Sequence, residues 1–249
     1  MFMAGKFAPK PVEVALHETG LWALRLLLIT LTITPLRHLT GRNGLIQFRR
    51  MLGVGALGYG LVHLGLYIVD QKFDLAKVVS EIVLRFYLTI GTLSLVAMIA
   101  LGATSFDRVI RRMGAVAWNR LHLLTYPLTL LGLWHGALQS KINVSEAAVM
   151  TGIFFALMLF RLLRRRIGMP MLLAAALVPL TMLATAIIEA GWYALATGIP
   201  AMRVWEANIM LDLQPRPALV AGLVVLALPL FAGLVRLVAP ARPAIPRSI

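Results

Sequence analysis

The sequence contains no cysteine and few acidic residues. The absence of cysteine from its 249 residues excludes disulfides, thiolate metal sites, iron–sulfur clusters and covalently attached c-type haem. Histidine is then the main side chain that could ligate a metal. Only 10 residues are Asp or Glu, and all charged residues together make up 14% of the chain. So few charges cannot solvate the surface of a soluble protein of this size, and a soluble globular enzyme is excluded.

Long apolar runs dominate the rest of the sequence. Hydrophobic residues make up 60% of the chain, and several runs approach the ~20 residues that cross a bilayer as a helix. These runs are continuously apolar, whereas the strands of a membrane barrel would alternate. We therefore predict an all-α fold, a polytopic transmembrane helical bundle of about seven spans at residues 19–36, 51–69, 83–103, 119–138, 147–163, 171–190 and 217–238.

Basic residues are divided unevenly between the two sets of alternate loops. The richer set comprises Arg37, Arg42, Arg49, Arg50, Arg108, Arg111, Arg112, Arg120, Arg161, Arg164, Arg165, Arg166, Arg236, Arg242 and Arg247. The poorer set comprises Lys6, Lys10, Lys72, Lys77, Lys141, Arg203 and Arg216. The positive-inside rule places the richer set in the cytoplasm, with the N-terminus outside and the C-terminus inside. The net charge of +14 is thus a topology signal, and no nucleic-acid partner is expected.

Three of the five histidines, His63, His122 and His135, fall inside predicted spans, where a polar side chain needs a partner. Their two spans run outward from the cytoplasmic side, and both His63 and His135 lie about 20 Å along them. These two histidines are therefore expected at the same depth. His122 lies near the cytoplasmic face, about 20 Å along the helix axis from His135, so the two cannot bind one haem. Pro127 between them can bend the helix.

The depth-matched pair has two interpretations. Facing imidazoles on different helices suit the axial positions of a b-type haem, which needs no cysteine. Alternatively, each histidine is a core residue that hydrogen-bonds a neighbouring carbonyl. Because His63 and His135 are expected at the same depth, we favour the haem interpretation. A third alternative is a transporter that uses His63, His122 and His135 as a proton or metal relay.

Three arginines also have open roles. Arg85, near the outer boundary, is expected either to pair with a haem propionate or to extend to the interface. Arg49 and Arg50 are expected to be positive-inside anchors, with a flavin phosphate, as in FMN, or an inner-haem propionate as the alternative ligand. No catalytic acid–base pair and no nucleotide-binding motif is expected.

Several motifs, taken in order, resemble a known family. They are His17-Glu18-Thr19-Gly20, Ile33-Thr34-Pro35-Leu36, Arg49-Arg50-Met51-Leu52-Gly53, Leu61-Val62-His63-Leu64, Arg85-Phe86-Tyr87-Leu88-Thr89-Ile90-Gly91, Ala103-Thr104-Ser105 and Trp118-Asn119-Arg120-Leu121-His122-Leu123-Leu124-Thr125-Tyr126. The chain resembles the haem-binding membrane subunits of bacterial periplasmic methionine sulfoxide reductase systems, the MsrQ (YedZ) family of ferric-reductase-like transmembrane proteins. Phe86 stands where that family usually has proline.

The resemblance implies one or two b-type haems bound by His63, His122 and His135 in a multi-pass protein of the bacterial inner membrane. It implies an electron-transfer subunit rather than a catalytic one, passing electrons from a cytoplasmic flavin reductase or a membrane quinol to a periplasmic molybdopterin-dependent reductase. A transmembrane ferric or other metal reductase is the alternative. The expected organisation is a periplasmic segment at 1–18, a haem-binding core at 19–166, and an additional C-terminal hairpin at 167–249 with a periplasmic loop and a cytoplasmic tail.

Overall fold

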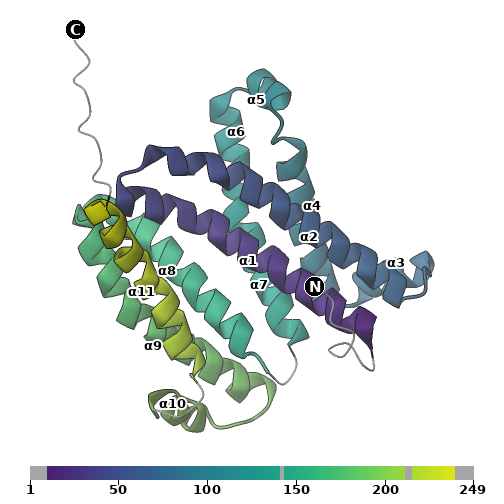
Figure 1. The fold of residues 1–249 in the computed structure, drawn as a ribbon. Helices are drawn as coiled ribbons and strands as arrows, with labels where there is room; N and C mark the ends of the chain where they lie inside the picture. The colour runs from purple at the N-terminus through teal and green to yellow at the C-terminus, as the bar shows by residue number, and fades with distance from the viewer. Residues whose placement is uncertain (1–9, 141–142, 211–214, 239–249) are drawn as a thin grey trace. The chain divides into compact units, whose positions relative to one another are not determined.

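The fold is helical throughout the part of the chain that the computed structural model describes, residues 10–140, 143–210 and 215–238 (Figure 1). No strand occurs in these ranges, so the predicted fold class is confirmed. Lys6, Lys141, Asp212, Arg242 and Arg247 lie outside the described residues. The elements are α1 (Pro11–Thr40), η1 (Asn43–Gln47), α2 (Phe48–Asp70), α3 (Leu75–Leu84), α4 (Phe86–Ala103), α5 (Asp107–Met113), α6 (Ala115–Leu121), η2 (His122–Leu124), α7 (Thr125–Gln139), α8 (Ser145–Ile167), α9 (Pro170–Ala196), α10 (Ala201–Ile209) and α11 (Pro217–Val238).

Six helices in the described ranges are long and apolar enough to cross a membrane: α1, α2 together with η1, α4, α8, α9 and α11. The chain is a multi-pass membrane protein. The remaining predicted span, 119–138, is built from α6, the 3-10 turn η2 and α7. Proline explains the break, because Pro127 has no N–H for the carbonyl of Leu123 and its ring crowds that carbonyl. Leu123 lies within η2.

Helix α1 begins at Pro11, earlier than residue 19, where the predicted span starts. Proline is favoured in the first turn of a helix, and Glu13 there suits the positive end of the helix dipole. Neither residue is apolar, so the apolar run from which the span was predicted does not include this first part of the helix. Residues 11–18 of the predicted N-terminal segment are therefore helical.

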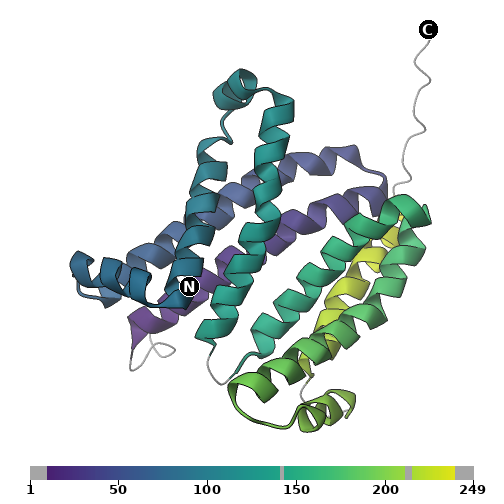
Figure 2. The same ribbon diagram turned by 180° about the vertical axis from the view of Figure 1, so that it is seen from behind.

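The first compact unit contains residues 10–30 and 50–147. Helices α4 and α7 lie side by side in both views (Figure 2), and the Ser94 hydroxyl donates to the Leu128 carbonyl at 2.9 Å. Gly132 of α7 allows close packing, because a Cβ there would lie 2.8 Å from Leu24 Cδ2. The intramembrane charge of Arg25 on α1 is paired with Glu146.

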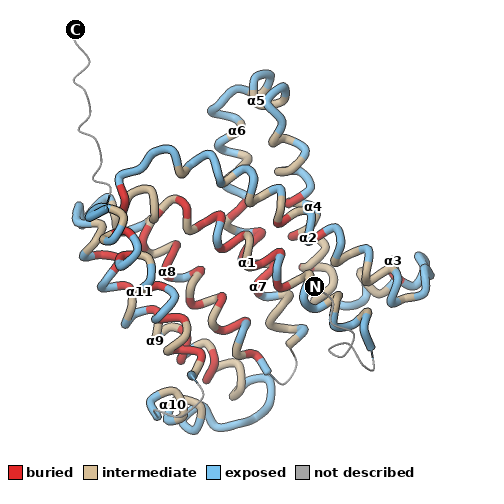
Figure 3. The backbone as a smooth tube through the Cα atoms, viewed as in Figure 1, coloured by how far each residue is buried: buried red, intermediate tan, exposed pale blue. Residues whose placement is uncertain are grey.

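The second compact unit contains residues 31–49 and 148–238 of the described chain. Its core joins the last turns of α1 to α8, α9 and α11, which contain buried stretches (Figure 3). The buried core residues are Leu39, Ala156, Phe160, Leu173, Ala174, Leu177, Val225 and Ala232. The predicted hairpin spans 171–190 and 217–238 correspond to α9 and α11, which pack on each other. The short helix α10 between them is held by a 2.7 Å hydrogen bond from Asn208 to the buried Glu189.

Candidate functional site

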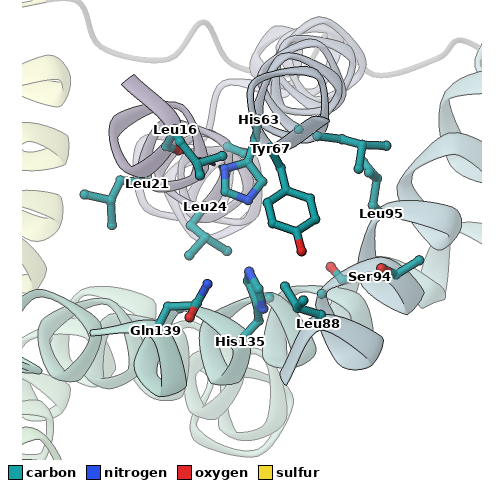
Figure 4. Close-up of a pocket in the computed structure, with 18 of the residues that line it drawn as sticks. Leu16, Leu21, Leu24, His63, Tyr67, Leu88, Ser94, Leu95, His135 and Gln139 are labelled. Atoms are coloured by element: carbon teal, nitrogen blue, oxygen red, sulfur yellow. Dashed lines mark hydrogen bonds between the residues drawn. The ribbon is translucent and has the colours of Figure 1, made fainter. Parts of the chain in front are cut away.

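A cavity of about 450 Å³ lies within the first compact unit (Figure 4). Its wall is formed by α1, α2, α4 and α7, with one residue from α3, and it falls in the size range of small-molecule and cofactor sites. Leucines and glycines line most of it, including Leu24, Leu88 and Leu95. Glu13, His17, Tyr67 and Gln139 add polar groups where α1 starts and where α2 and α7 end. We call this the outer end of the unit, the side that the topology prediction assigns to the periplasm.

Two of the predicted site residues, His63 of α2 and His135 of α7, point toward one another across this cavity (Figure 4). Their ring centroids lie 6.2 Å apart, and the ring planes meet at 84°. His63 is seven residues from the end of α2 and His135 is four from the end of α7. At 1.5 Å per residue, both lie within about 10 Å of the outer end. The structure thus brings together the two histidines that the sequence predicts at one depth.

Each of the two imidazoles is fixed by a backbone carbonyl on another helix. His63 Nδ1 lies 2.8 Å from the carbonyl oxygen of Leu16 on α1, and His135 Nδ1 lies 2.8 Å from that of Tyr87 on α4. A carbonyl only accepts, so Nδ1 carries the proton in both rings and donates it. Nε2 is then the unprotonated nitrogen. A hydrogen bond from Nδ1 to a carbonyl is expected if the histidines are ordinary core residues. A metal-ligating histidine is usually oriented by the same kind of bond.

A glycine makes room for each imidazole. A Cβ at Gly20 would lie 2.9 Å from His63 Nδ1, and one at Gly91 would lie 2.7 Å from His135 Nδ1. Each glycine follows the accepting residue by four positions, Leu16 by Gly20 and Tyr87 by Gly91. Residues four apart stack on one helix face, so the ring sits over the glycine while bonding the carbonyl one turn earlier. The same arrangement is therefore built twice.

The spacing of the two rings fits a shared metal ion. Metal–imidazole bonds are about 2 Å long and a ring centroid lies about 1 Å behind its nitrogen, so two imidazoles that together held one metal ion would have centroids about 6 Å apart. A T-shaped contact of aromatic rings spans the same distance. The spacing therefore suits both interpretations, and the cavity around the pair favours a bound cofactor. Donor chemistry, spacing and cavity all fit a bis-histidine haem.

A chain of polar side chains connects α2, α3 and α4 at the outer end. The Tyr67 hydroxyl donates to Glu81 at 2.8 Å, and Arg85 donates to Glu81 and to the Tyr87 hydroxyl, both at 3.0 Å. Tyr67 follows His63 by one turn and lines the cavity. The hydrogen bond to Tyr87 and the charge of Glu81 raise the pKa of Arg85. Arg85, predicted to pair with a propionate or to reach the interface, therefore pairs with Glu81 here.

The other predicted site residues lie away from the cavity lining. His122 is in η2, stacks on Trp118 with centroids 3.8 Å apart, and bonds the Trp118 carbonyl through Nδ1 at 3.0 Å. Arg50 forms an ion pair with Asp107, and this hydrogen bond lowers the pKa of the Asp107 carboxyl. Arg49 lies beside it in the first turn of α2. Among the described residues no group of three or more His, Cys, Asp or Glu side chains gathers as a metal site.

Comparison with known proteins identifies the class of membrane protein to which this chain is similar. Residues 19–133 match the family described as "Ferric reductase like transmembrane component". The curated relatives include the "Protein-methionine-sulfoxide reductase heme-binding subunit MsrQ" of Xanthomonas campestris pv. campestris (strain 8004), 44% identical over 156 residues, which cover 62% of this chain and 71% of that protein. The protein of the same name from Brucella anthropi is 40% identical over 162 residues, covering 65% and 73%. The chain belongs to the MsrQ family. No solved structure matches it.

Proposed function

We propose that this chain is the haem-binding membrane subunit of a protein-methionine-sulfoxide reductase system, and that His63 and His135 hold a b-type haem in the cavity. The observation that carries the proposal is the pair of facing imidazoles, 6.2 Å apart, each with Nδ1 on a carbonyl. The relatives described above are named for heme binding in such a system. When bound, the haem would supply one-electron chemistry.

The residues around the two histidines have the role of fixing them before the cofactor arrives. Hydrogen bonds to Leu16 and Tyr87 select the tautomer with Nε2 unprotonated, which is the form that binds a metal. Gly20 and Gly91 let the rings approach the helix backbones closely enough for those bonds. Leu24, Leu88 and Leu95 keep the cavity apolar, which suits a porphyrin face.

The topology and organisation predicted from the sequence complete the proposal. The protein would lie in the bacterial inner membrane with its outer end in the periplasm, where a molybdopterin-dependent reductase is the acceptor. His63 and His135 lie close to the outer end, which supports electron transfer to an acceptor on that side. A cytoplasmic flavin reductase or a membrane quinol would be the donor. The haem-binding core would comprise 19–166 and the added hairpin 167–249.

We assign His122 to a second, inner redox site. Separately, Arg49 and Arg50 are proposed as positive-inside anchors, with a flavin phosphate, as in FMN, or an inner-haem propionate as the alternative ligand. His122 lies on the segment α6–η2–α7 that also carries His135, and it precedes His135 by 13 residues. The separation of about 20 Å along the helix direction suits a relay between the two faces.

Absorbance of the purified protein tests the main proposal. We expect a Soret band in the wild type and its loss in His63→Ala and in His135→Ala, because an axial pair needs both imidazoles. His38→Ala, a histidine of the second unit, is the matched control and should keep the band. A colourless wild type would instead support the transporter alternative. Rapid reoxidation of the reduced protein by ferric chelates, without the periplasmic reductase, would support the metal reductase alternative.

A further inference from the structure

The second compact unit carries a cluster of cations at the end where α1 and α8 finish. Arg37 and His38 are in the last turns of α1, and Arg161 and Arg164 are in the last two turns of α8. The charges of all three arginines reach the ring of His38. The neighbouring Leu39 and Phe160 are part of the buried core, so the cluster rests on a packed surface.

Carboxylates are scarce in this unit. Residues 31–49 and 148–249 contain three carboxylates, Glu189, Glu206 and Asp212. Glu189, the first of them, is 19 residues into α9, about 28 Å from the end of α9 that follows the arginines. Among the described residues, no carboxylate forms an ion pair with Arg37 or Arg164, so an anion from outside the chain can serve as their counterion.

The hydrogen bonds of the cluster leave only donors for a ligand. Arg164 donates to Nδ1 of His38 at 3.1 Å, which makes Nδ1 the acceptor nitrogen and places the ring proton on Nε2. Nε of Arg37 is buried and has no hydrogen-bond partner among the described residues. Guanidinium groups and an imidazole N–H accept nothing, so the missing partner is a group with several acceptor oxygens.

Arg161 has a different role. It donates to the carbonyl of Leu157 in its own helix at 2.7 Å and to the carbonyl of Leu31 on α1. These bonds join α8 to α1 and are the ordinary use of an arginine near a helix C-terminus. Because Arg161 joins α8 to α1 in this way, we take Arg37 and Arg164 as the arginines that face a ligand.

We propose that Arg37, His38 and Arg164 form a phosphate-binding site, and that its ligand is the headgroup of an anionic phospholipid. Phosphate oxygens accept the paired donors of a guanidinium. A basic pocket between membrane helices on the side rich in arginine is a typical headgroup site. Both helices are long enough to span the bilayer and end here, which puts the cluster at headgroup level. The site lies in the unit without the paired histidines and does not depend on haem binding.

Lipid-dependent thermal stability tests the site. The purified full-length protein in detergent is titrated with phosphatidylglycerol, with phosphatidylcholine or with inorganic phosphate, and bound lipid is counted by native mass spectrometry. We expect phosphatidylglycerol to raise the melting temperature and to remain bound, with affinity about tenfold or more weaker in R37Q/R164Q. R165Q/R166Q is the matched control, because it removes two charges from exposed positions of the same helix end.

Three outcomes would overturn the proposal. Equal loss in both double variants would show general charge attraction. Equal response to phosphatidylcholine would show a dependence on lipid without a phosphate-specific site. Saturation by inorganic phosphate with no retained lipid would show a soluble ligand. If R37Q/R164Q does not fold, R37K/R164K replaces it: lysine keeps the charge but lacks the paired donors, and its phosphatidylglycerol affinity should still fall below that of the control.

Discussion

Replacing Gly91 by alanine tests whether the glycine behind His135 is needed for the site. The added Cβ would lie 2.7 Å from Nδ1 of His135 and 2.9 Å from two ring carbons. Non-bonded heavy atoms prefer about 3.5–4.0 Å, so the ring or the helix must shift by about 1 Å. Such a shift is several times the ~0.2 Å tolerance of a metal–ligand distance. The hydrogen bond to Tyr87 is strained by the same movement.

The expected magnitude follows from overpacking. Extra methyl groups in a packed site typically cost about 1–3 kcal/mol, which corresponds to about 5- to 150-fold weaker haem binding. Haem titration into the apoprotein, followed by the Soret band, measures this affinity. Gly58→Ala on α2 is the matched control, because a Cβ at Gly58 meets nothing within 4 Å and alanine favours helix. Equal haem affinity and identical spectra for the two variants would refute the assigned role of Gly91.

Three further predictions concern topology, the polar chain and the surface ion pair. A periplasmic reporter should be active after Ser140 and a cytoplasmic one after Arg166, and the reverse result would invert the proposed direction. Tyr67→Phe should lower the unfolding free energy by about 1–2 kcal/mol through loss of the bond to Glu81, whereas the exposed Tyr59→Phe should not; equal values would contradict this. Asp107→Asn should lower the melting temperature at neutral pH, because the folded-state pKa of Asp107 is below its ordinary 3.8. The pair's stabilisation is complete above that ordinary value and is lost as pH falls through the lowered pKa, so wild type and variant should converge in acid.

The sequence alone predicts the helical class and the depth of the paired histidines. Apolar runs fix where helices cross, and counting residues from the basic span ends places His63 and His135 at one level. Pro127 also signals the break that becomes η2. Hydropathy does not predict where α1 begins, because Pro11 and Glu13 in its first turn are not apolar, although both are typical of a helix start.

The partners of the histidines could not be predicted in the same way. His63 meets Leu16 and Gly20, more than 40 residues away, only when α1 and α2 adopt one particular rotation about their axes. In a helix that is apolar on all sides, hydropathy does not indicate which face turns toward a neighbouring helix. Tyr67 and Glu81 are likewise joined by a hydrogen bond across 14 residues of the chain, which no local pattern predicts. The motifs that carry the family resemblance include Gly20 and Gly91, but the sequence does not indicate why glycine is needed at either position.

The doubled carbonyl-and-glycine arrangement has a consequence for assembly. Neither imidazole is oriented by its own helix: α1 sets the ring on α2, and α4 sets the ring on α7. A ligand held by both rings therefore cross-links two helix pairs, and its binding energy adds to the stability of the tertiary fold rather than to that of any single helix. Insertion of the helices can be complete while the pairs are still apart. If His63 and His135 hold the proposed haem, the apoprotein is expected to be more exposed to proteolysis than the loaded protein.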